Sequence, residues 1–114
     1  MKYRVRITKP AQNDMRVIHR YIADDLQNRT AAASWISLID EKIQSLDENP
    51  ARFPLVQDSY LASKGIRMMV VKHHLVFFVI REEARFVSVM RVLYSRRDWL
   101  RILRSVVESQ PDER

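Results

Sequence analysis

The sequence contains no cysteine, only one glycine and no long apolar run. The lack of cysteine excludes disulfides, thiolate catalysis and zinc sites built on thiolates. The chain also has no glycine-rich loop that could cradle a phosphate and no HExxH metal motif. Its longest apolar stretch is far too short to cross a membrane, and the N-terminal MKYRVRITKP lacks the apolar centre of a signal peptide. We therefore expect a cytoplasmic protein with no membrane partner, metal or cofactor.

The length and composition favour a single domain. A chain of 114 residues that is 46% hydrophobic suits one compact unit with a single core. Neither an internal repeat nor a linker-like stretch divides it. We predict one domain over residues 1–108 and a frayed tail over residues 109–114, SQPDER.

Positive charge is concentrated in the second half of the chain. Residues 64–104 carry ten Lys or Arg against three Asp or Glu, whereas residues 1–63 carry nine against eight. Such a basic region favours an anionic partner, either nucleic acid or an acidic protein segment. Improved solubility is the plainer alternative.

Runs of β-branched and aromatic residues predict three consecutive strands at 66–71, 75–80 and 86–93. The middle run, LVFFVI, has no polar face, which predicts a central strand covered on both sides. Residues 2–8 alternate between apolar and polar side chains and predict a further strand with one face in water.

Two amphipathic helices are expected between the first strand and the other three. Apolar residues recur at steps of three and four over 11–26 and again over 32–46, so the two helices can pack as a hairpin. Thr8 or Lys9 is the expected cap of the first helix, and Thr30 that of the second.

The last expected elements are an irregular crossing and a short helix. Residues 49–64 link the hairpin to the strands, and Asp98 can cap a final helix with a broad apolar face. The element order is then β-α-α-β-β-β-α. This order predicts an α+β fold in which the helical hairpin packs on an antiparallel sheet, followed by a short C-terminal helix.

Several basic residues of the predicted strands could bind an anion. Arg67 and Arg91 lie within apolar runs, where a charge must reach water or find a partner. A salt bridge to an Asp or Glu of the helices or of the tail is at least as good an interpretation of either one. These two arginines and Tyr94, together with Arg96 and Arg97, would form a basic surface that contains an aromatic ring, which suits phosphate contact and base stacking.

The adjacent histidines His73 and His74 fall in a predicted turn between two strands. A metal site is conceivable there, but neighbouring strand residues point to opposite faces, and surface turn histidines are the plainer interpretation. We predict no metal site.

The succession of YRVRIT, PAQNDMRVIHRYIADDL, AAASWISLIDEKIQSLDENPARFP, GIRMMVVKHHLVFFVI and VMRVLYSRRDWLRIL resembles the RelE/ParE superfamily of toxins from type II toxin-antitoxin modules, also called the plasmid stabilisation family. The resemblance covers residues 3–103, and its specificity lies in the joint order of the segments. It implies a small intracellular toxin whose cognate antitoxin wraps the sheet and helices.

The resemblance implies two alternative mechanisms. RelE-like members cut messenger RNA on the ribosome without a metal, by activating the ribose 2′-hydroxyl against its own phosphate. That reaction needs a base, an acid and cations beside the phosphate. ParE-like members inhibit DNA gyrase and need no nuclease residues.

Carried over onto this sequence, the RelE-like mechanism assigns the catalytic roles to Tyr94, Arg67 and His74. The residues assigned to RNA or phosphate binding are Arg91, Arg96, Arg97 and Lys72. Two positions depart from the RelE pattern, since Met69 stands where RelE has a lysine and Leu93 replaces the histidine of the YoeB-like branch.

We predict a growth-inhibiting toxin that acts by ribosome-dependent mRNA cleavage, with the ribosome, mRNA and a cognate antitoxin as partners. Gyrase inhibition is a close second hypothesis, since the long hairpin and the GIR segment equally resemble the ParE branch. A non-toxic binding protein that retains the fold is the third.

Overall fold

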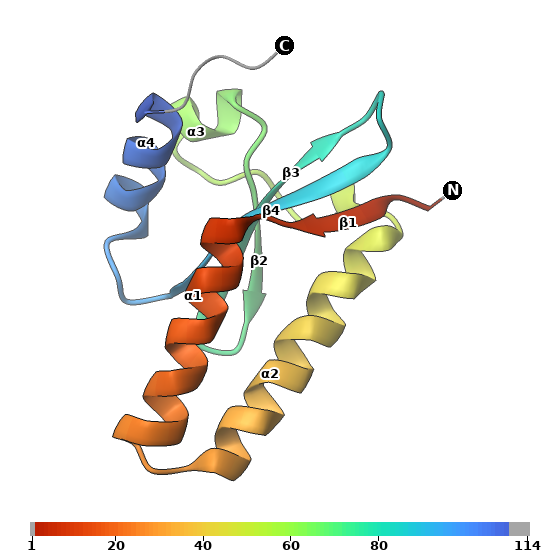
Figure 1. Ribbon diagram of the computed structural model, residues 1–114. Helices are drawn as coiled ribbons and strands as arrows, with labels where there is room; N and C mark the ends of the chain where they lie inside the picture. Colours follow the sequence, from red (N-terminus) through yellow and green to blue (C-terminus); the bar gives the residue numbers. More distant parts are fainter. Residues whose placement is uncertain (1, 110–114) are drawn as a thin grey trace.

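The computed structural model describes residues 2–109 of the chain (Figure 1). Within this range the predicted elements follow in the predicted order, with one short helix added. In chain order the elements are β1 (Arg4–Ile7), α1 (Lys9–Arg20), a π-helical turn (Tyr21–Asp25), α2 (Arg29–Gln44), two 3-10 turns (Ser45–Asp47 and Pro50–Arg52), α3 (Ser59–Ser63), β2 (Arg67–Val71), β3 (His74–Arg81), β4 (Phe86–Tyr94) and α4 (Trp99–Ser109).

The four strands form one sheet in the order β1-β4-β3-β2. β2, β3 and β4 pair antiparallel, as predicted. β1 instead runs parallel to β4, with Arg4 opposite Phe86 and Ile7 opposite Val89, so the prediction of a purely antiparallel sheet was wrong for this pair. A parallel pair needs a long crossover, which the helical hairpin and the two intervening strands provide. The predicted α+β class is confirmed.

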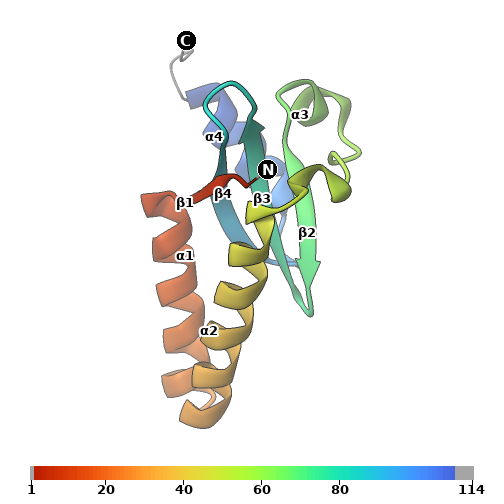
Figure 2. The ribbon, with the colours of Figure 1, turned by 90° about the vertical axis from the view of Figure 1, so that its right-hand side faces the viewer.

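Both faces of the sheet are covered (Figure 2). The hairpin of α1 and α2 packs on one face around Ile39, Ile43 and Phe78, while α3 and α4 cover the other around Phe77 and Leu103. β3 is buried from Leu75 through Val79, which confirms the prediction of a central strand without a wet face. This arrangement leaves the strand ends and part of the edge strand β2, where Val70 is 61% exposed, available to a partner.

Of the two helices in the hairpin, one has the predicted cap and the other does not. The Thr8 hydroxyl accepts a hydrogen bond from the Ala11 amide at 3.4 Å and so caps α1. α2 is capped by Asn28, whose side chain accepts the Ala31 amide at 2.9 Å, and not by the predicted Thr30. Asparagine is the stronger cap of the two, and its use starts the helix two residues earlier.

The crossing over residues 49–64 is less irregular than predicted, because Asp58 caps the short helix α3 through the Leu61 amide at 3.1 Å. Of the predicted tail, Ser109 is the last residue of α4, and residues 110–114 lie outside the described residues. Among the described helices, none is long and apolar enough to cross a membrane.

Candidate functional site

Basic and aromatic side chains gather at the end of the sheet where β2 turns into β3 and where β4 ends. The turn consists of Lys72 and His73, and Lys72 adopts the left-handed backbone conformation with φ 55°. His74 pairs with Tyr94, and the Ser95 amide donates to the His73 carbonyl at 2.8 Å. This register brings together a set that we call the sheet-end cluster: Lys72, His73, His74, Tyr94, Arg96 and Arg97.

His74 lies between two aromatic rings. Its ring centroid is 5.1 Å from that of Trp35 and 5.7 Å from that of Tyr94. The indole Nε1 of Trp35 donates to Nδ1 of His74 at 3.2 Å, which requires Nδ1 to be unprotonated and leaves the ring proton on Nε2. Burial, and then the neighbouring His73, lower the pKa of His74. In this tautomer the Nε2–H group can donate a hydrogen bond, whereas Nδ1 can take up a proton only if its hydrogen bond with Trp35 breaks. Tyr94, on the other side of the imidazole, is 42% exposed.

Trp35 is a site residue that the sequence interpretation placed only in the apolar stripe of α2. It is 8% exposed, and a buried indole usually finds an acceptor for its N–H group. The need of the buried indole N–H group for an acceptor is the signal that could have identified Trp35 as a site residue. The partner itself lies 39 positions away, so it could not be named without the fold.

Arg91 is not free at the sheet end. Its guanidinium donates to both carboxylate oxygens of Asp14, at 2.7 and 2.8 Å. The hydrogen bond to Asp14 raises the pKa of Arg91, and the arginine side chain is only 19% exposed. Of the two interpretations open for Arg91, the structure contains the salt bridge to a helix carboxylate.

Arg67 is also engaged, and it lies elsewhere on the sheet. Its guanidinium donates to the carbonyls of Phe53 at 2.7 Å and Ala51 at 3.3 Å. It stands four residues before Val71, the partner of His74, which corresponds to about 13 Å along a strand. The structure therefore brings His74 and Tyr94 together but does not bring Arg67 to them.

Lys72, Arg96 and Arg97 are exposed, and none of them has a salt bridge within residues 2–109. They can meet a phosphate in solution without breaking an internal contact. The same part of the chain contains no group of three or more His, Asp or Glu side chains that could hold a metal ion.

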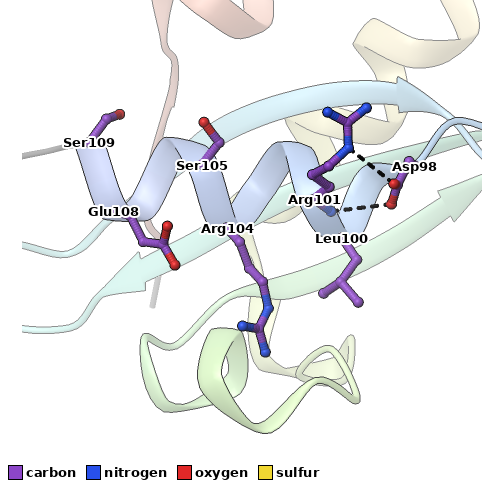
Figure 3. Close-up of a pocket in the computed structure, with 7 residues that line it drawn as sticks. All are labelled: Asp98, Leu100, Arg101, Arg104, Ser105, Glu108 and Ser109. Atoms are coloured by element: carbon purple, nitrogen blue, oxygen red, sulfur yellow. Dashed lines mark hydrogen bonds and ion pairs between the residues drawn. The ribbon is translucent and has the colours of Figure 1, made fainter.

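A hollow of about 720 Å³ lies on the outer side of α4 (Figure 3). Asp98 caps this helix through the Arg101 amide at 3.3 Å, as predicted, and its carboxylate also accepts Arg101 Nε at 3.2 Å. No predicted catalytic or phosphate-binding residue lines the hollow. Its lining residues are Asp98, Leu100, Arg101, Arg104, Ser105, Glu108 and Ser109.

Two solved structures have a similar fold. The chromosomal ParDE toxin-antitoxin system from P. aeruginosa aligns with a TM-score of 0.68 and 13% identity, over 82% of this chain and 96% of that one. The toxin-antitoxin complex RelBE2 from Mycobacterium tuberculosis aligns with a TM-score of 0.56 and 21% identity, over 82% and 99%. At these identities the similarity is one of fold. A search of curated proteins found no match.

The sequence itself matches a family model over residues 5–99, which is most of the chain. The matching family is described as the ParE toxin of the type II toxin-antitoxin system parDE. The predicted resemblance to the RelE/ParE superfamily is thus confirmed. With the fold and the family match in agreement, this chain belongs to the ParE toxin family of type II toxin-antitoxin systems.

Proposed function

We propose that this toxin arrests growth by inhibiting DNA gyrase and does not itself cut RNA. The proposal reverses the order of the two mechanisms that the sequence suggested. Family membership supports it, because the ParE branch is the one for which the resemblance implied gyrase inhibition. A gyrase inhibitor acts where the chromosome is, so the proposal implies a cytoplasmic protein.

The observation that carries the proposal is that Arg67, one of the three predicted catalytic residues, lies apart from the other two and that Arg91 is engaged as well. Only the exposed cations Lys72, Arg96 and Arg97 are then left for the phosphate. Metal-free RNA cleavage needs a cation at the scissile phosphate to stabilise the charge of the transition state. Arg91 is held by Asp14, and Arg67 is held by two backbone carbonyls about 13 Å from the Tyr94 end of the sheet. Releasing Arg91 would leave the carboxylate of Asp14 buried without its partner, at a cost of about 3–5 kcal/mol.

RNA cleavage is the second candidate, and one contact favours it. His74 and Tyr94 lie 5.7 Å apart between ring centroids, close to the exposed cations Lys72, Arg96 and Arg97. The imidazole and the phenol hydroxyl could serve as base and acid, provided that His74 first gives up the hydrogen bond that its Nδ1 accepts from Trp35. In this alternative the partners would be the ribosome and mRNA.

A cognate antitoxin is part of the proposal. The two similar structures are described as a ParDE system and a RelBE2 toxin-antitoxin complex, which supports a protein partner that neutralises this chain as well. The basic excess over residues 64–104 would attract an acidic antitoxin segment.

The test compares a supercoiling assay with purified gyrase and an RNA cleavage assay in a translating extract. We expect the toxin to inhibit supercoiling by gyrase and to leave transcripts intact in a translating extract. In cells, the expected consequences of induction are filamentation and a DNA damage response. Cut transcripts that map inside codons, with supercoiling unaffected, would overturn gyrase inhibition in favour of RNA cleavage. Harmless induction would point to a non-toxic protein.

A further inference from the structure

A second basic surface lies at the free end of the helical hairpin. In Figure 1 this end, where α1 passes into α2, projects at the bottom of the view beyond the turn between β2 and β3. A hollow of about 440 Å³ opens there, and we call it the hairpin-end hollow. Its lining residues are Arg16, His19, Arg20, Ala23, Asp24 and Arg29.

The arginines of this hollow lack the carboxylate partners that others in the chain have. Arg20 and Arg29 make no side-chain hydrogen bond or salt bridge within residues 2–109, and Arg16 bonds to the neutral amide of Asn13. By contrast, Arg91 and Arg104 each hold a carboxylate. The hollow thus presents three guanidinium groups to solvent beside a single carboxylate.

Helix stability explains only part of this arrangement, because Arg20 is favourably placed in the last turn of α1 but the other charges are not. Arg16 and Arg20 are four residues apart on one face of α1, and like charges at that spacing destabilise a helix. Arg29 adds a third positive charge at the first turn of α2, where the helix dipole is also positive. A bound anion would offset both effects.

The backbone at the hollow is unusual as well. The turn Tyr21–Asp25 is π-helical, and the Leu26 amide donates to the Tyr21 carbonyl at 3.0 Å. Such turns occur frequently at functional sites. This one places Ala23 and Asp24 on the wall of the hollow.

We propose that the hairpin-end hollow binds the phosphate backbone of nucleic acid. Guanidinium groups match phosphate oxygens with paired hydrogen bonds. A peptide is a poorer fit, because Ala23 is the only apolar residue among the six that line the hollow, and protein hot spots need buried apolar contact. The site is separate from the sheet-end cluster, and it does not depend on gyrase being the target.

The test uses fluorescence anisotropy with a duplex DNA and, in parallel, a single-stranded RNA at low salt. The variant R16Q/R20Q removes two lining charges. Its control, R4Q/K42Q, removes two exposed charges from β1 and from the last turn of α2, at the opposite end of that helix from the hollow. Neither side chain has a hydrogen bond or salt bridge within residues 2–109. Circular dichroism verifies that both variants remain folded.

We expect R16Q/R20Q to weaken binding about tenfold or more at low salt and to lower the salt dependence by about two counterions, with a much smaller effect of the control. The substitution Asp24→Asn should tighten binding, because it removes the repelling carboxylate. The probe, DNA or RNA, whose affinity falls more in R16Q/R20Q identifies the kind of nucleic acid that the hollow prefers. Absence of binding to both probes, equal weakening by the control, or displacement by a glutamate-rich peptide at equal charge concentration would overturn the proposal.

Discussion

The carboxylate of Asp14 joins α1 to the sheet by holding Arg91 of β4 through two hydrogen bonds, at 2.7 and 2.8 Å. It also accepts the backbone amide of Val92 at 2.9 Å. β1 pairs with β4 only as far as Val89, so this carboxylate takes the place of a strand neighbour at the open edge of β4. Asp14, which is 8% exposed, therefore satisfies both the backbone amide of Val92 and the guanidinium of Arg91.

Asp14→Ala should therefore destabilise the fold by about 3–5 kcal/mol, because it leaves a half-buried guanidinium and a buried amide without an acceptor. Urea denaturation followed by circular dichroism measures the change. Asp98→Ala is the matched control, since it removes an exposed pair with Arg101 and should cost only about 1 kcal/mol. Similar losses for the two variants would show that burial of the Asp14 pair contributes nothing.

The sequence could predict that Arg91 needs a partner, but not which one. A charge inside an apolar strand must be paired or reach water, and that rule is local. Asp14 lies 77 positions away and looks like one of many polar helix residues. The same limit applies to the parallel direction of β1, which depends on where a crossover ends and not on the composition of the strand.

Predictions made from neighbouring residues were correct where the structure itself depends on contacts within a few residues. The periodicity of the hairpin, the cap at Thr8 and the buried run of β3 all follow from neighbours within a few residues. The π-helical turn at Tyr21–Asp25 was not predicted, because its residues fit an ordinary helix equally well. The contacts of His74 with Tyr94 and Trp35 could be predicted only in part. They depend on the register between β3 and β4 and on where α2 packs, and neither is determined by neighbouring residues.

Leu103 is the fully buried residue of α4, and Trp99, Ile102 and Val107 are partly buried around it. Leu103 is 0% exposed beneath the helix, so Leu103→Ala should lower the free energy of unfolding by about 2–5 kcal/mol. Leu100→Ala, on the same helix and 38% exposed, should cost about 1 kcal/mol or less. Chemical denaturation of both variants tests this, and equal costs would mean that α4 is not held through its buried side.

Stability should fall as the pH drops through the range in which His74 titrates. Burial lowers the pKa of His74, so the unfolded chain takes up this proton more readily than the folded one. The stabilising contribution is complete above the unfolded pKa of about 6.5 and is lost as the pH falls through the folded pKa. Unfolding free energies between pH 5 and 8 measure the slope.

Two variants assign that slope to His74. His74→Phe keeps a ring between Trp35 and Tyr94 but cannot titrate, so its stability should depend less on pH than that of the wild type. His19→Asn, at a half-buried histidine in the last turn of α1, is the matched control variant. An unchanged slope in His74→Phe would assign the pH dependence to other groups.

Tyr94→Phe separates the two candidate mechanisms in cells. The substitution removes only the hydroxyl of a side chain that is 42% exposed, and the remaining ring can still pack against His74. If the toxin acts on gyrase, growth inhibition should persist at equal protein abundance, because no proton transfer is involved. If it cuts RNA with this phenol as acid or base, cleavage should fall by about 10²–10⁴-fold. Growth curves with immunoblotting and transcript mapping measure both quantities. Leu100→Ala serves as the control for a mild surface change, and transcripts that are cut by the wild type and intact with Tyr94→Phe would contradict gyrase inhibition.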